Sequence, residues 1–212
     1  MTVAVDPASS RHVPRIAPGF VDPVHGAQVS FRAALDALAN PGIVHLVDVE
    51  LPDEGIPIGA LAVLLSLVDG DTPLWTSASV SESSRAYLRF QAGARFATSH
   101  SACAFAYVAT LQELPQISSF SPGSAMSPEE STTIIVAVDG FVGGATASLD
   151  GPGCREPREI SPAGFTLSLW EQLARNHDRF PMGVDVLLVS GRRIVGLPRS
   201  TRISLSTLGQ EG

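Results

Sequence analysis

The chain has 212 residues, of which 44% are hydrophobic, so it is long enough to bury the core of one larger domain. Its net charge of −7 excludes the strongly basic surface of a typical nucleic-acid-binding domain. The two cysteines lack CxxC spacing, which argues against structural zinc and a disulfide framework. No apolar run reaches the roughly 18 residues of a membrane span, and the first residues lack the apolar core of a signal peptide, so we expect a cytoplasmic protein.

All 14 basic residues are arginines, and the sequence contains no lysine. This composition excludes a P-loop lysine, a Schiff-base lysine and a Ser-Lys catalytic dyad. The chemical exclusion holds whatever genomic bias produced the composition.

In chain order, residues 1–18 are predicted to form a flexible N-terminal arm, and residues 19–212 a single α/β domain. A helix is expected to begin at Asp22-Pro23, an N-cap followed by proline, and to end at Asn40-Pro41-Gly42. Its apolar residues at helical spacing predict one buried face, made of Ala27, Phe31, Ala34, Leu35 and Leu38.

Strands and helices then mix along the rest of the chain. Pro57–Val68 is apolar all round and predicts a buried helix, and the capping-box spacing of Ser79 and Glu82 predicts a helix to about Gln91. A last long helix is expected from Ser161-Pro162 to about Asn176. Strands are expected near residues 43–49, 74–76, 103–108, 132–138, 145–149, 158–160 and 202–206, with a long, functional or mobile connection at 115–131.

The most informative stretch is Phe180–Thr201, which reads as two buried strands joined at Ser190-Gly191-Arg192. Asp185 interrupts the first of these strands, and a carboxylate there must be paired or hydrogen-bonded. Because strands that are apolar on both faces need cover on both sides, the sequence predicts a three-layer α/β sandwich with a mixed central sheet.

Several polar groups could carry function, and each has a structural alternative. Asp69 and Asp71 could bind Mg²⁺ or simply form a turn. Arg85, Arg89 and Arg95 could meet a phosphate or an acidic partner, or form a solvated surface.

The histidines and cysteines give weaker indications. His45 could be a ligand or a satisfied histidine of its strand. His100 and Cys103 are three residues apart, where strand geometry would turn them to opposite faces, and Cys154 has no evident activating partner. No catalytic cluster and no metal site is therefore predicted, which favours a binding or complex-forming role.

Six segments, in this order and at these spacings, resemble the PhnH family of the bacterial carbon–phosphorus lyase system. Asn40 and the sequence Pro198-Arg199-Ser200-Thr201 are mild departures from the pattern of that family. The segments are QVSFRAALDALANPG (28–42), LLSLVDGDTPLW (64–75), YLRFQAGA (87–94), LDGPG (149–153), FPMGVDVLLV (180–189) and GLPRST (196–201).

The resemblance implies a fold related to pyridoxal-phosphate-dependent transferases, but without their cofactor or any other. The missing lysine agrees, because no internal aldimine could form. The resemblance further implies a cytoplasmic homodimer that joins PhnG, PhnI and PhnJ. That complex attaches an alkylphosphonate to the ribose C1 of ATP, and this chain is expected to support assembly, stability or substrate access without a catalytic step.

The alternative is an enzymatic or ligand-binding subunit with a site for phosphonate or nucleotide. Arg199, Gly151 and Gly153 would then form the anion site, because arginine suits bidentate contacts and a glycine turn can present backbone N–H groups. In the structural alternative, Arg199 forms an ion pair with Asp185 that closes the end of the sheet.

Overall fold

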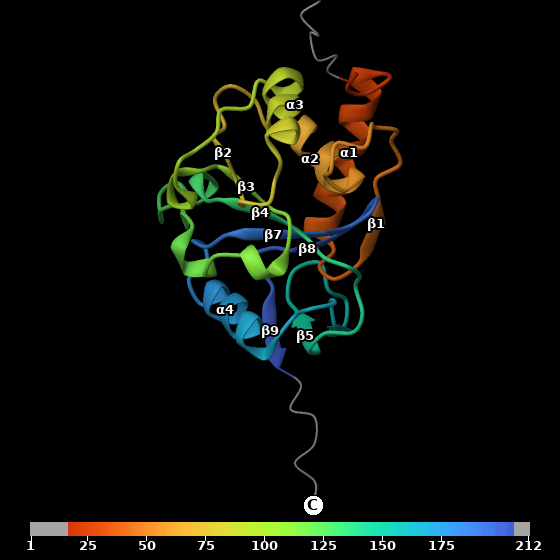
Figure 1. Ribbon diagram of the computed structural model, residues 1–212. Helices are drawn as coiled ribbons and strands as arrows, with labels where there is room; N and C mark the ends of the chain where they lie inside the picture. Colours follow the sequence, from red (N-terminus) through yellow and green to blue (C-terminus); the bar gives the residue numbers. More distant parts are fainter. Residues whose placement is uncertain (1–16, 206–212) are drawn as a thin grey trace, which may run out of the picture.

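The computed structural model describes residues 17–205, which build a three-layer α/β arrangement around a six-stranded mixed sheet (Figure 1). Three helices cover one face of this sheet, and the fourth helix with a small second sheet covers the other. In spatial order the strands of the large sheet are β1 (Val44–Leu46), β8 (Arg193–Leu197), β7 (Asp185–Ser190), β4 (Thr133–Ala137), β3 (Phe105–Val108) and β2 (Leu74–Thr76).

The large sheet has a parallel part and an antiparallel part. Strands β2, β3, β4 and β7 run parallel, and β8 and β1 are added antiparallel at one side. The predicted hairpin is confirmed as β7–β8, with Gly191 in the turn at φ +60°. The prediction of an α/β fold with a mixed central sheet is thus confirmed.

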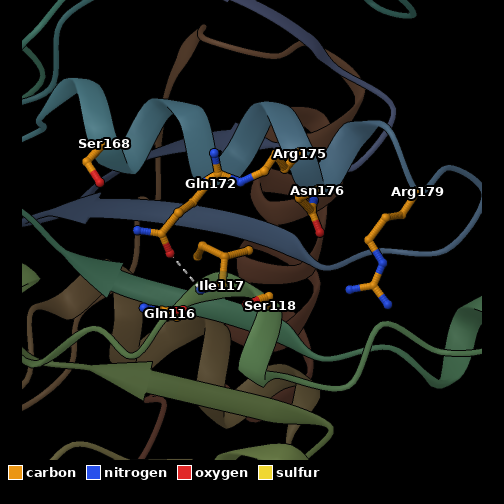
Figure 2. A pocket seen from close by; sticks show the side chains of 8 residues that line it. All are labelled: Gln116, Ile117, Ser118, Ser168, Gln172, Arg175, Asn176 and Arg179. Atoms are coloured by element: carbon orange, nitrogen blue, oxygen red, sulfur yellow. Dashed lines mark hydrogen bonds between the residues drawn. The ribbon is translucent and has the colours of Figure 1, made fainter.

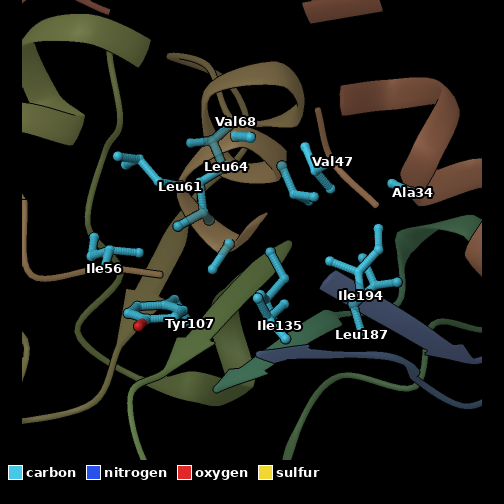
Figure 3. Packing of buried hydrophobic residues seen from close by; sticks show 14 of the residues in the cluster. Ala34, Val47, Ile56, Leu61, Leu64, Val68, Tyr107, Ile135, Leu187 and Ile194 are labelled. Carbon is cyan, nitrogen blue, oxygen red and sulfur yellow. The ribbon is translucent and has the colours of Figure 1, made fainter. Parts of the chain in front are cut away.

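Successive residues of the central strands point into different cores, as the pleat requires. On β4 and β7, Ile135 and Leu187 point into the core between the large sheet and the three helices on one face, which Figure 3 shows. Ile134 and Leu188 point into the core between the sheet and the fourth helix. All four side chains are fully buried. Covering both faces explains why these strands are continuously apolar in sequence.

Helix α1 (Pro23–Ala39) begins and ends as predicted, with the Asp22 carboxylate accepting hydrogen bonds from the N–H groups of Val24 and His25. The predicted buried face is confirmed at Ala34 and, as a partly buried residue, at Leu38, but it is wrong at Phe31 and Leu35. Phe31 and Leu35 are 45% and 50% exposed. Small residues pack against the sheet in their place, because close approach of α1 to β8 leaves no room for larger ones: the buried positions are Gly26, Ser30, Ala33, Ala34 and Ala37.

The other helices agree with the sequence except at two starts. Helix α2 (Ile58–Leu67) is buried from Gly59 to Leu64, as its uniform apolarity predicts. Helix α3 (Glu82–Ala92) is capped by Ser81, and not by Ser79, which instead hydrogen-bonds the Glu113 carboxylate. Helix α4 (Leu167–His177) is capped by Thr166 and starts later than predicted, because Ser161–Gly164 forms a turn with Gly164 at φ +78°.

The second sheet is small and antiparallel, with the order β6 (Arg158–Ile160), β5 (Ala147–Asp150) and β9 (Arg202–Leu205). The connections carry short 3-10 turns. Two of them, η3 (Ile117–Ser119) and η4 (Pro128–Glu130), lie in the long connection before β4. The turns η1 (His100–Ala102) and η2 (Leu111–Glu113) flank β3.

Most of the predicted N-terminal arm, residues 1–16, lies outside the described residues, as do residues 206–212. None of the helices between residues 17 and 205 is long and apolar enough to cross a membrane.

Candidate functional sites

Asp185 and Arg199 meet where β7 begins and β8 has just ended. The Arg199 side chain binds the carboxylate in a fork, with Nε 3.1 Å from Oδ1 and Nη2 2.6 Å from Oδ2. The backbone N–H of Arg199 donates to the same Oδ1 at 2.8 Å. The hairpin brings both residues to the same end of the sheet, so the sequence prediction of this pair as a sheet-closing contact is confirmed.

The Arg199 guanidinium also donates hydrogen bonds to the connection before β4. Nη1 donates to the Pro128 carbonyl oxygen at 2.6 Å, and Nη2 also donates to the Ser131 hydroxyl oxygen. Four of the five guanidinium N–H groups therefore have a partner in the chain. The side chain is only 14% exposed, and that of Asp185 is 19% exposed. In this state Arg199 joins three segments and has little capacity left for a ligand.

Of the predicted glycine partners, Gly151 lies beside the backbone that follows Arg199, whereas Gly153 lies beside the end of α1. Gly151 has a φ of +125°, and a Cβ added to it would lie only 3.1 Å from the Ser200 carbonyl oxygen. A Cβ on Gly153 would lie 2.0 Å from the Ala39 carbonyl oxygen. The turn is thus filled by the chain itself, and the ligand role of Arg199, Gly151 and Gly153 stays a prediction.

An open depression of about 380 Å³ adjoins the ion pair. Its wall contains Glu129 and Asp185 next to Arg199, so both charge signs face it. Apolar groups supply much of the rest, among them Phe180, Pro181 and Pro198.

A second hollow, also of about 380 Å³, was not found by sequence reasoning. It lies between α4 and η3, and Figure 2 shows the side chains that line it. The one sequence signal was the length of the connection at 115–131, which is typical of functional loops. We call this hollow the α4–η3 groove, and its lining consists of Gln116, Ile117, Ser118, Ser168, Gln172, Arg175, Asn176 and Arg179.

Two hydrogen-bonded residues fix the walls of the α4–η3 groove. Gln172 Oε1 accepts from the Ile117 N–H at 3.0 Å, which ties η3 to the middle of α4. Asn176 is buried and exchanges two 2.9 Å hydrogen bonds with the backbone of Val184, which holds α4 against the start of β7. The groove is therefore a built feature between rigid elements.

The Asp69–Asp71 segment forms a turn. Asp69 Oδ1 accepts from the N–H groups of Asp71 and Thr72 and from the Thr72 hydroxyl, each at 2.9 Å. The hydrogen bond from the Asp71 N–H is the main cause that lowers the pKa of Asp69. Among residues 17–205, no group of three His, Cys, Asp or Glu residues is placed to hold a metal ion.

The three arginines of the predicted basic cluster have separate partners. Arg85 donates to the Ser77 carbonyl oxygen at 3.1 Å, Arg89 lies 3.6 Å from Glu82, and Arg95 lies 3.6 Å from Asp71. The pairs of Arg89 and Arg95 are exposed to solvent, which favours the structural alternative of a solvated surface.

The thiols lie in environments that reduce their reactivity. Cys103 is buried and donates to the His100 carbonyl oxygen at 3.2 Å, so its contact to His100 is through the backbone and not the imidazole. Burial raises the pKa of the Cys103 thiol, and burial also raises that of Cys154. The thiolate is the reactive form, so a raised pKa opposes nucleophilic catalysis at neutral pH.

The mixed sheet with helices on both faces, the closed strand end and the groove on α4 define an α/β protein. The chain belongs to the PhnH family, because residues 18–204 match the family of bacterial phosphonate metabolism proteins of that name.

Two curated relatives agree with this assignment. A Rhizobium meliloti (strain 1021) protein, named alpha-D-ribose 1-methylphosphonate 5-triphosphate synthase subunit PhnH, is 34% identical over 189 residues, or 87% of this chain and 93% of the relative. A Stutzerimonas stutzeri protein, named putative C-P lyase subunit protein HtxG, is 33% identical over 182 residues, or 84% of this chain and 86% of the relative.

Proposed function

We propose that this chain is a subunit of a carbon–phosphorus lyase complex, together with PhnG, PhnI and PhnJ. In that role it supports formation of alpha-D-ribose 1-methylphosphonate 5-triphosphate from ATP and methylphosphonate in the cytoplasm. It carries no catalytic step and no pyridoxal phosphate. The names of the two relatives support the subunit role, and both relatives align with most of the chain.

The observation that carries the proposal is an exposed apolar surface on α1 and the edge strand β1. We call it the α1–β1 surface, and its members are Val21, Val24, Phe31, Leu35, Ile43, Val44 and Leu46. These side chains lie on or next to two elements that contact each other, and such a concentration of exposed apolar groups is typical of interaction sites. The outer edge of β1 has no neighbouring strand within residues 17–205, and unpaired edges are themselves prone to association.

Polar groups beside the α1–β1 surface favour a protein partner over a lipid surface. A groove between α1 and β1 contains Arg32 and Asp36, so both charge signs are present. His45 Nε2 is buried there and has no hydrogen-bond partner within residues 17–205.

Co-expression of the tagged chain with PhnG, PhnI and PhnJ tests the role. The wild-type chain should co-purify with all three, and Phe31→Glu combined with Leu35→Glu should abolish co-purification. Phe90→Glu is the matched control, because Phe90 is 68% exposed on α3, away from the proposed surface. A wild-type chain that never co-purifies would refute the subunit role, whereas equal loss in the control would refute the surface.

We also propose that the chain alone is a homodimer of the PLP-transferase-like family fold. Light scattering on the purified chain tests this, and a monomer at micromolar concentration would contradict it. The α1–β1 surface is assigned to the other subunits, so the Phe31→Glu, Leu35→Glu chain should keep the mass of the wild type.

A further inference from the structure

We propose that the α4–η3 groove is a binding site for a small molecule that carries a phosphate or phosphonate group. The groove is separate from the Asp185–Arg199 pair and from the α1–β1 surface. Recognition of an oxyanion follows from the groove itself, while the choice of phosphate or phosphonate among oxyanions rests on the proposed function. Its volume of about 380 Å³ falls within the range of small-molecule sites.

The charge of the lining is one-sided in an otherwise acidic protein. Arg175 on α4 and Arg179 in the turn that follows α4 are both among its lining residues, and no carboxylate is (Figure 2). The chain as a whole has 21 acidic against 14 basic residues. The groove therefore offers an entering anion arginine side chains, whose guanidinium groups suit bidentate contacts to phosphoryl oxygens.

The acidic side chains and the helix dipole near these arginines compete only weakly with an anion for them. Glu171 lies 3.8 Å from Arg175, and both side chains are more than half exposed, so this pair is loose. Asp178 caps α4 and is exposed, outside the lining. The C-terminal end of a helix carries about half a negative charge, which two arginines exceed. Within residues 17–205, the Arg179 guanidinium has no hydrogen bond or ion pair of its own.

The rest of the groove offers hydrogen-bond donors at positions that follow one face of α4. Ser168, Gln172 and Arg175 recur every three or four residues, so they line up along the helix. Gln172 uses its oxygen for Ile117, which leaves its NH₂ group directed away from that bond (Figure 2). Gln116 and Ser118 face the same hollow from η3.

The lining of the groove thus offers two kinds of contact to a ligand. The arginine side chains suit contacts to the charged phosphoryl group. The amide and hydroxyl side chains suit hydrogen bonds to the oxygen-rich remainder of a larger ligand.

Isothermal titration calorimetry on the full-length chain with methylphosphonate, inorganic phosphate and ATP tests the site. We expect saturable binding of at least one probe, and comparison of the three identifies a phosphonate, a free phosphate or a nucleotide as the source. Gln172→Glu places a carboxylate in the groove while keeping the acceptor for Ile117, and it should weaken binding at least about tenfold. Arg175→Ala combined with Arg179→Ala should weaken it by as much or more.

Gln28→Glu is the control, because Gln28 is exposed on α1 and receives the same change of charge. It should leave the affinity within about twofold. Absence of saturable binding of all three probes up to about 10 mM would overturn the site, as would equal affinity of Gln172→Glu and wild type. Gln172→Glu should still co-purify with the other subunits, so failure of this site and failure of the subunit role are distinguished.

Discussion

Asp185 and Arg199 hold the two ends of the β7–β8 hairpin together through three hydrogen bonds, two from the guanidinium and one from the backbone. Removing Arg199 leaves a mostly buried carboxylate without its cation, which is far costlier than losing a surface pair. We expect Arg199→Met to lower the free energy of unfolding by about 3 kcal/mol, measured by urea denaturation.

Arg202→Met is the matched control, because the Arg202–Asp150 pair spans 3.2 Å but both side chains are about half exposed or more. Its effect should stay below about 1 kcal/mol. Similar losses in the two variants would show that the Asp185–Arg199 pair is no more than a surface contact.

Gly196 allows α1 to lie directly on β8. A Cβ at this position would come 2.3 Å from the Ala37 carbonyl oxygen, and a backbone atom of a helix cannot yield as a flexible side chain can. We expect Gly196→Ala to cost at least about 2 kcal/mol of unfolding free energy, because the helix must move off the sheet. Thermal and urea unfolding measure this.

Gly70→Ala provides the comparison for Gly196→Ala, since a Cβ there has nothing within 4 Å. Its unfolding free energy should change by less than about 1 kcal/mol. Equal stability of the two variants would contradict the close contact between α1 and β8.

Glu113 links η2 to the start of α3 through Ser79. The hydrogen bond from the Ser79 side chain is the main cause that lowers the pKa of Glu113 below its ordinary value of 4.5. A carboxyl whose pKa is lower in the folded state adds stability above the unfolded pKa, and this stability is lost as pH falls through the folded pKa.

Urea midpoints measured between about pH 6 and pH 3 should therefore fall less steeply for Glu113→Gln than for wild type. Glu156→Gln, an exposed change of the same kind, should follow the wild-type curve. Identical slopes in all three proteins would disprove the coupling between Glu113 and Ser79.

The two thiols should differ in accessibility. Cys103 is 3% exposed, whereas Cys154 is half-buried in a turn after β5, and burial raises the pKa of both. In the native protein we expect iodoacetamide to modify Cys154 faster, as measured by mass spectrometry of peptides. In urea the two rates should converge, and a faster native reaction of Cys103 would contradict its burial.

Sequence patterns predicted the sheet well, because they record burial on both faces. The run from Val186 to Val189 is apolar at every position and is indeed covered by two layers. The Asp185–Arg199 contact was also predictable, since a carboxylate at the start of a buried strand needs a partner. The register and strand order were not, because pairing between distant segments leaves no local mark in the sequence.

The failure at α1 has a specific cause. Periodicity assigns the largest apolar residues to the core, but Gly196 draws α1 so close to β8 that only small residues fit beneath it. Phe31 and Leu35 are consequently displaced to the surface. The α4–η3 groove was missed for a related reason: Gln116 and Gln172 are 56 positions apart and become neighbours only through folding.

The strand order determines when the sheet can be completed during synthesis. Strand β1, at residues 44–46, pairs only with β8, at residues 193–197, within the described sheet. A nascent chain on the ribosome therefore exposes β1 until nearly the whole domain has been translated. Its edge and the apolar residues beside it stay available to chaperones until β8 has emerged from the ribosome.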